Sequence, residues 1–126
     1  MPASYQLDPA LRLVRSRAWG VLTDAESQAH YVGLAGDPAF DPTFHQLCDL
    51  RDVIEIDMSA GAIRRLAKAS TFAPGVRRAF VAADDTHFGL SRMLQAFCEF
   101  EGTEIGVFRT VSEAAQWLGL ETDVFG

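Results

Sequence analysis

Apolar and polar residues alternate with a period of two along the first part of this chain. The pattern runs through residues 5–7 and 11–19, and Asp8, Pro9 and Ala10 separate the two runs. Alternation of this kind is typical of half-buried strands. Because proline in sheets is confined to edges, bulges and turns, the two runs predict an antiparallel hairpin near the edge of a sheet.

Two T-x-x-E sequences mark the starts of helices. In such a capping box, each of the two side chains bonds to a backbone N–H group of the other residue. Thr23 with Glu26 predicts the start of one helix, and Thr110 with Glu113 predicts the start of the last. Residues 36–38 are predicted to end the first helix. The apolar face predicted for that helix consists of Leu22, Ala25, Ala29 and Val32.

The rest of the chain alternates between short apolar runs and longer segments with helical spacing. Strands are predicted at residues 44–50, 78–82 and 103–108, and helices at residues 59–69 and from about residue 85 to Gly102. The element order is therefore β-β-α-β-α-β-α-β-α, which predicts an α/β fold with four helices and a mixed, mostly parallel five-stranded sheet. We expect residues 1–126 to form a single domain.

The net charge of −6 limits the classes of partner that this chain is expected to bind. Sequence-independent nucleic-acid binding needs a cationic face, so we do not expect it here. The sequence contains no signal peptide and no long apolar run, which predicts a cytoplasmic protein without membrane insertion. Cys48 and Cys98 lie among apolar neighbours and are expected to be buried free thiols.

No motif in the sequence nominates an active site. His30, His45 and His87 are far apart and lack the spacing of metal ligands, and no glycine-rich nucleotide-binding motif occurs. Asp84 and Asp85 follow a predicted strand, at a place where open α/β sheets often bind ligands, but capping the next helix is their expected role. We therefore expect a non-enzymatic protein without a metal ion or cofactor.

The third predicted helix has more large apolar side chains than one buried face requires. Its predicted core stripe consists of Leu90, Met93, Leu94 and Phe97. The excess predicts either an apolar ligand cavity or a dimer surface. The candidate residues for that surface are Phe88, Met93, Phe97 and Phe100.

Residues 47–66, LCDLRDVIEIDMSAGAIRRL, predict a buried strand, a loop and then a helix that begins with small residues. This segment resembles the pattern D-L-S-x-V-x-F-I-D-S-S-G-L of the STAS domain, the SpoIIAA-like fold of anti-sigma-factor antagonists and of the cytoplasmic tails of sulfate transporters. The resemblance implies this fold over nearly the whole chain, in agreement with the element order, and residues 4–26 also resemble an uncharacterised bacterial branch of STAS-like proteins. The agreeing positions are Asp49, Leu50, Val53, Ile56, Asp57 and Ser59, with Gly61 one place later than the family glycine.

The chain departs from this family at the residue on which the family's switch depends. In the antagonists, a partner kinase phosphorylates the serine directly after the motif aspartate, and the corresponding residue here is Met58, which has no hydroxyl. Ser59 is a candidate for a displaced phosphorylation site, because a helix N-terminus favours a dianionic group. The simpler interpretation, which we favour, is that Ser59 is an N-cap residue.

Three functions remain open at the level of sequence, and the least favoured of them is a small enzyme, because no residue is nominated as a nucleophile or base. The resemblance implies a regulatory or scaffold domain that docks a kinase-like or sigma-regulatory protein through a loop at residues 52–59 and the helix that follows. The alternative is a small-molecule or lipid-binding module with an apolar pocket beside the third helix, as in the related CRAL-TRIO fold. A homodimer is compatible with both. The candidate docking residues are Asp52, Glu55, Asp57, Met58, Ser59, Gly61, Arg64 and Arg65.

Overall fold

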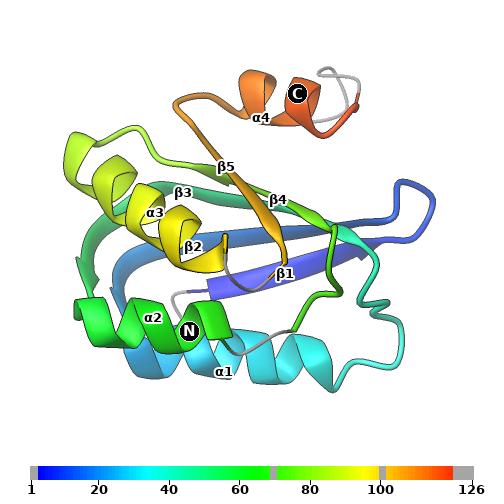
Figure 1. Ribbon diagram of the computed structural model, residues 1–126, viewed down its shortest axis with the longest axis horizontal. Coiled ribbons are helices and arrows are strands. Elements are labelled where there is room, and N and C mark those ends of the chain that lie inside the picture. The colour runs from blue at the N-terminus through cyan, green and yellow to red at the C-terminus, as the bar shows by residue number, and fades with distance from the viewer. Residues whose placement is uncertain (1–2, 69–70, 100–101, 121–126) are drawn as a thin grey trace.

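Five strands lie side by side in the order in which they occur in the chain (Figure 1). The computed structural model describes residues 3–68, 71–99 and 102–120. Its strands are β1 (Ala3–Asp8), β2 (Leu13–Thr23), β3 (His45–Asp57), β4 (Arg77–Val81) and β5 (Glu104–Phe108). Its helices are α1 (Asp24–Ala35), α2 (Ala60–Lys68), α3 (Asp85–Cys98) and α4 (Val111–Trp117). The β-β-α-β-α-β-α-β-α order predicted from the sequence is confirmed.

The N-terminal hairpin forms one edge of the sheet, as predicted. β1 pairs antiparallel with β2, from Ala3 opposite Ala18 to Asp8 opposite Leu13. All other neighbouring strands pair in parallel, so the sheet is mixed and mostly parallel. β2 begins two residues later and ends four residues later than the predicted segment 11–19.

Local side-chain bonds start three of the helices where the sequence predicts them. Thr23 accepts a hydrogen bond from the Glu26 N–H at 3.3 Å, and Thr110 accepts one from the Glu113 N–H at 3.2 Å. Asp84 caps α3 by accepting bonds from the backbone of the two residues that follow Asp85. These caps satisfy backbone donors that have no partner within the helix.

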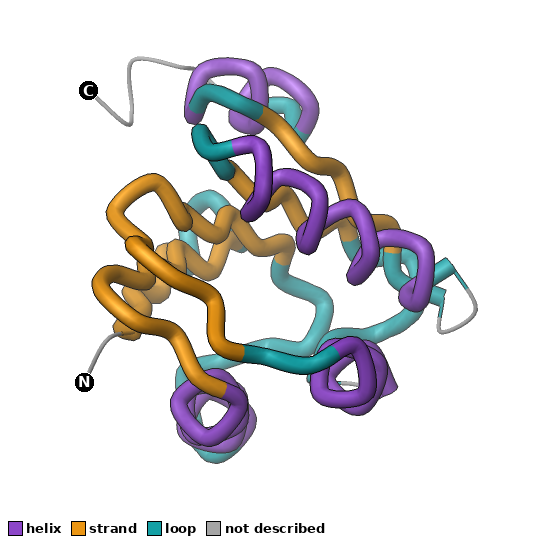
Figure 2. The backbone as a smooth tube through the Cα atoms, turned by 90° about the vertical axis from the view of Figure 1, so that its left-hand side faces the viewer, coloured by secondary structure: helices purple, strands orange, loops and turns teal. Residues whose placement is uncertain are grey.

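Helices cover both faces of the sheet. Figure 2 shows the sheet between α4 at the top and the pair α1 and α2 at the bottom. On β3, Cys48 belongs to a core with residues of α2 and α3, whereas Leu47 belongs to a core with residues of α4. On β4, Phe80 faces the first core and Ala79 the second. The two faces follow from the alternation of side chains along a strand.

The buried faces of α1 and α3 differ from the predicted ones. In α1, the predicted residues Ala25, Ala29 and Val32 are exposed, Val32 by 73%. The residues that α1 buries are Ser27, Tyr31 and Leu34. In α3, Leu94 is buried as predicted, but Leu90, Met93 and Phe97 are only partly buried. The other buried residues of α3 are His87, Ser91 and Cys98. In both helices the buried face includes polar side chains, which periodicity of apolar residues does not detect.

The strand before α2 is longer than predicted. β3 continues to Asp57, so most of the predicted loop at residues 52–59 is a strand, and that prediction was wrong. The pairing of β3 with β2 shifts register twice, between Arg17 and Trp19 and again between Gly20 and Val21. Such bulges place an extra residue in one strand and re-aim the side chains that follow.

Candidate functional site

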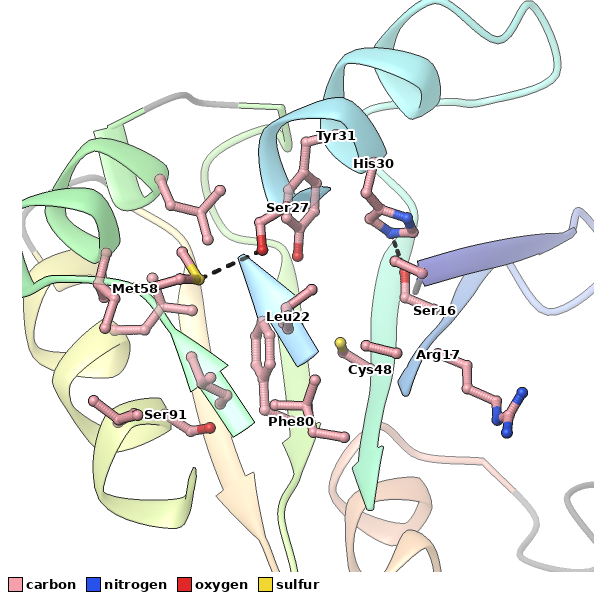
Figure 3. Close-up of a pocket in the computed structure, with 18 residues that line it drawn as sticks. Ser16, Arg17, Leu22, Ser27, His30, Tyr31, Cys48, Met58, Phe80 and Ser91 are labelled. Carbon is pink, nitrogen blue, oxygen red and sulfur yellow. Dashed lines mark hydrogen bonds between the residues drawn. The ribbon is translucent and has the colours of Figure 1, made fainter. Parts of the chain in front are cut away.

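A cavity of about 70 Å³ lies between the sheet and the helices α1, α2 and α3 (Figure 3). Most of its wall is apolar, and Leu22, Ile63 and Leu94 come from three different elements. Its volume is sufficient for several water-sized particles, but it is smaller than the roughly 150 Å³ apolar cavity that is known to hold benzene. In this conformation the cavity therefore fits a small ligand better than an acyl chain.

Met58 lies in the wall of this cavity. It directly follows β3, and its sulfur accepts a hydrogen bond from the Ser27 hydroxyl of α1 at 3.5 Å (Figure 3). The residue at the position of the family's phosphorylated serine therefore points inward and is half-buried. A thioether is a weak acceptor that adapts to irregular space, so this contact joins α1 to the β3–α2 junction mainly by packing.

A network of buried polar side chains borders the cavity. The Ser16 hydroxyl lies 3.0 Å from Nε2 of His30, and the Gln46 amide donates to the same hydroxyl at 2.9 Å. The Gln46 amide also lies 3.2 Å from the Tyr31 hydroxyl. Arg78 donates to the Gln46 carbonyl at 2.9 Å and to the Tyr31 hydroxyl at 3.0 Å. Every residue of this chain of contacts thus finds a hydrogen-bond partner, as burial requires.

Arg78 is the centre of this network, and its role was not predicted from the sequence. Arg78 is only 6% exposed, and no carboxylate in the described part of the chain forms an ion pair with it. Its guanidinium carbon lies 4.6 Å from the centroid of the Phe72 ring, 5.4 Å from Tyr31 and 5.5 Å from Phe80. Neutral acceptors and aromatic faces therefore stabilise this charge. The signal in the sequence was an arginine at the start of the buried run RAFVA.

Burial favours the uncharged forms of His30, Tyr31 and Cys48 in this region. Desolvation lowers the pKa of His30, and the positive charge of Arg78 lowers it further. Burial raises the pKa of the Tyr31 hydroxyl, and it raises the pKa of the Cys48 thiol to about 12. A protonated Cys48 is a poor nucleophile. The cavity therefore presents neutral hydrogen-bonding groups rather than a reactive thiolate.

The predicted docking residues form a continuous stretch at the end of β3 and the start of α2. The structure exposes Asp52, Glu55, Asp57, Ser59, Gly61, Arg64 and Arg65, and it half-buries Met58. Two of the charged residues pair with residues outside this stretch: Asp52 bonds to Arg17 at 2.9 Å, and Arg65 lies 3.5 Å from Asp24 of α1. Surface pairs of this kind contribute little stability.

Ser59 occupies the N-cap position of α2. Its hydroxyl accepts a hydrogen bond from the Ala62 N–H at 3.1 Å, and its carbonyl accepts one from the Ile63 N–H at 3.0 Å. The side chain is exposed at the same time. Capping and access for a modifying enzyme are therefore compatible in this conformation.

The predicted apolar surface of α3 lies apart from the cavity. Phe88, Met93 and Phe97 are half-buried, and none of the three lines the cavity, whose α3 residues are Leu90, Ser91 and Leu94. The Phe88 ring lies 4.1 Å from the guanidinium carbon of Arg109. Phe100 lies outside the described residues.

The described residues contain neither a candidate metal site nor a membrane-spanning helix. Within residues 3–68, 71–99 and 102–120, no group of three or more His, Cys, Asp or Glu side chains is placed to hold a metal ion. In the same ranges, no helix combines the length and the apolar character that crossing a bilayer requires.

The chain is similar in structure to an uncharacterised protein of the DUF3478 family from Shewanella loihica PV-4, which is described as having a SpoIIAA-like fold. The TM-score is 0.63 at 17% sequence identity, and the match covers 92% of this chain and 93% of the other. No family model matches the sequence, and no curated protein matches it either. The chain therefore has a SpoIIAA-like α/β fold, which confirms the fold that the STAS resemblance implied.

Proposed function

We propose that this chain is a non-enzymatic regulatory or scaffold domain that acts in the cytoplasm and docks a protein partner. The docking face consists of Asp52, Glu55, Asp57, Met58, Ser59, Gly61, Arg64 and Arg65. The partner is a kinase-like or sigma-regulatory protein, in keeping with a SpoIIAA-like fold. The domain needs no metal ion or cofactor for this role.

One observation carries this proposal: the exposed, charged end of β3 is followed closely by Gly61, Arg64 and Arg65, which are exposed on α2. Acidic side chains lie on the strand and basic ones on the helix, so the face has both signs of charge. Complementary charges of this kind favour specificity and rapid association more than affinity. Met58 packs inward against α1 at the junction of β3 and α2, which supports a docking face with a fixed conformation.

The test is co-purification of the tagged full-length chain from its native cells. The double substitution Arg64→Glu and Arg65→Glu reverses two exposed charges of the docking face and should remove the specific partner. Arg92→Glu, an exposed charge reversal on α3, is the control and should leave the partner bound. A partner retained by the double variant would refute this docking face.

Phosphorylation of Ser59 would add regulation to the same face. A phosphate there would lie at the N-terminus of α2, where backbone donors favour it, but it would have to replace the present cap bond to Ala62. Mass spectrometry of protein isolated under several growth conditions is the measurement. Consistent absence of the modification would eliminate Ser59 as a switch.

The second candidate function is binding of a small apolar molecule, and the cavity beneath α1, α2 and α3 is the observation that favours it. Native mass spectrometry of freshly purified protein should then show a bound mass. Ala18→Val, which adds volume to the cavity wall, should reduce the bound fraction, whereas Ala96→Val on the exposed side of α3 should not. A clean unliganded mass of the unsubstituted protein would argue against this function.

A homodimer is compatible with both functions. The free edge of β1 and the partly buried apolar residues Phe88, Met93 and Phe97 offer two possible surfaces. Sedimentation equilibrium over a range of concentrations would show whether the mass rises above that of one chain. A constant monomer mass would remove the dimer from the proposal.

A further inference from the structure

A small polar pocket adjoins the buried network at Arg78. Its volume is about 10 Å³, which is room for one particle of about the size of a water molecule. Arg78 of β4 and Tyr31 of α1 form part of its wall, and Thr71 and Thr103 belong to the segments that lead into β4 and β5. We call this space the Arg78 pocket. Its other lining residues are Leu66, Ala67 and Phe72.

The positive charge of Arg78 has no counter-ion in the part of the chain that the structure describes. Within residues 3–68, 71–99 and 102–120, no carboxylate lies within ion-pair distance of it. A guanidinium stays protonated in proteins, so the charge is permanent. The two groups that accept its hydrogen bonds, the Gln46 carbonyl and the Tyr31 hydroxyl, are neutral. A buried cation without a counter-ion is costly, and an anion bound beside it offsets that cost.

One nitrogen of this guanidinium has donors to spare. Nε donates to Gln46 and Nη2 donates to Tyr31, whereas Nη1 has no hydrogen bond within the described residues. No fully enclosed side-chain nitrogen or oxygen of the described residues lacks a partner, so Nη1 must reach open space. Arg78 lines the Arg78 pocket but not the larger cavity beneath α1, α2 and α3. The two N–H groups of Nη1 are therefore available to a ligand in the Arg78 pocket.

The directions of the hydrogen bonds leave a second donor at the border of this pocket. Because Nε of Arg78 can only donate, the oxygen of the Gln46 amide faces Arg78 and its nitrogen faces Tyr31. The Tyr31 hydroxyl thus accepts from both neighbours, and neither bond uses its own proton. Burial raises the pKa of Tyr31, so the hydroxyl keeps this proton at neutral pH. Tyr31 can therefore donate to a further acceptor.

We propose that the Arg78 pocket binds one small inorganic anion of the size of chloride. Every polar side chain of its wall can donate a hydrogen bond, since the hydroxyls of Thr71 and Thr103 have no partner within the described residues and can rotate toward an anion. A monatomic ion accepts several such donors at once. The volume is too small for phosphate or sulfate, which excludes the common larger anions.

This site is independent of both proposed functions. It uses none of the docking residues of β3 and α2, and a ligand of the larger cavity is not needed to form it. The unfolded chain has no such pocket, so an anion that binds it stabilises the folded state. The Arg78 pocket would thus couple the stability of the domain to the concentration of a small anion.

The test is urea unfolding of the full-length chain in sodium chloride and in sodium gluconate at equal ionic strength. Equal ionic strength matches the screening of surface charges, and gluconate is too large for the pocket. We expect greater stability in chloride. Once chloride exceeds its dissociation constant, each tenfold increase in its concentration should raise the folding equilibrium constant about tenfold. Equal stability in the two salts would overturn the proposal.

Substitutions in the wall connect this effect to the pocket. Arg78→Met removes the charge and should abolish the gain in chloride. Thr103→Val replaces a half-buried hydroxyl by a methyl group of the same size, so it tests the proposal even if Arg78→Met does not fold. It should weaken chloride binding by about tenfold, because a hydrogen bond to a charged group is lost. Thr86→Val and Arg92→Gln on α3 are exposed controls that should keep the full gain. A gain that Thr103→Val leaves unchanged would contradict the site.

Bromide provides a direct view of the same site. Anomalous diffraction from crystals soaked in sodium bromide should place an ion within hydrogen-bond distance of Nη1 of Arg78. No bromide in the pocket would overturn the proposal. A bromide peak without a chloride-dependent gain in solution would mean an adventitious ion only, and it would overturn the proposal as well.

Discussion

At the scale of single residues, His30 shows how burial controls charge. Its imidazole lies against Ser16 and between the rings of Tyr5 and Tyr31. Burial and then the charge of Arg78 lower its pKa below the ordinary 6.5. The unfolded chain therefore binds more protons than the folded chain as pH falls below about 6.5.

The consequence is a pH-dependent stability. The contribution of neutral His30 to the free energy of unfolding is fully present above pH 6.5, and it is lost as pH falls toward the lowered pKa of His30 in the folded protein. We expect the free energy of unfolding in urea to decrease between pH 7 and pH 5. His30→Gln keeps a polar group beside Ser16 but removes the titration, so its stability should depend less on pH in this range. Identical pH profiles for both proteins would contradict this prediction.

Gly106 provides a second residue-scale prediction, based on space. A Cβ at this position would lie 2.7 Å from Cε2 of Phe108 and 3.1 Å from Cε3 of Trp117. These rings pack together with centroids 5.5 Å apart, so neither moves freely. Gly106→Ala should therefore destabilise the fold by about 1–3 kcal/mol, measured by chemical denaturation.

Gly89 is the matched control for that substitution. A Cβ there would meet no atom within 4 Å, and the residue lies inside α3. Gly89→Ala should stabilise the protein by about 0.4–1 kcal/mol, because alanine loses less backbone entropy on folding. Equal effects of the two alanines would show that the ring contacts at Gly106 are not tight.

At the scale of elements, β3 explains where prediction from sequence fails. Strict alternation predicts an inward side chain at every second residue, but Leu50, Val53 and Ile56 all face the interior at a spacing of three. The two register shifts with β2 make this possible. A strand with bulges loses its period of two, so the sequence pattern after Leu50 resembled a loop.

A pair of substitutions can test which side chains of β3 face the core. Val53 is 7% exposed, whereas its neighbour Ile54 is 80% exposed. Val53→Thr should destabilise the protein by about 1–3 kcal/mol, because it buries a hydroxyl without a partner. Ile54→Thr should change the free energy of unfolding by less than about 0.5 kcal/mol. A larger loss for Ile54→Thr would mean that the strand has a different register.

Helix boundaries were predictable because they depend on neighbours in sequence. At Thr23, Asp84 and Thr110, the capping side chain accepts a hydrogen bond from a backbone N–H two or three residues later. The buried face of α1 depends instead on distant residues, since Tyr31 bonds to Gln46 and Arg78. The cavity beneath α1, α2 and α3 is likewise built from several strands and helices. Such sites become visible only when the register of the sheet is known.

At the scale of the whole molecule, one core connects four strands to α2 and α3. It includes Ala18 of β2, Cys48 of β3, Phe80 of β4 and Ile105 of β5. The cavity interrupts this core on the side of α1 and α2. Whether the core opens as one unit or locally at the cavity therefore bears directly on ligand entry.

The two buried thiols can distinguish these modes of opening. Cys48 lines the cavity and is 7% exposed, whereas Cys98 on α3 is 0% exposed and lies in the same core. Only an exposed thiolate reacts with an aromatic disulfide reagent, and burial raises the pKa of Cys48 to about 12. Cys48→Ala and Cys98→Ala each keep one thiol, so the labelling of each variant reports the free energy of opening around that thiol. If the core opens as one unit, this free energy should equal the free energy of unfolding of the same variant in urea. Faster labelling of Cys48 at low urea would instead demonstrate local opening at the cavity, and it would identify the route by which a small ligand enters.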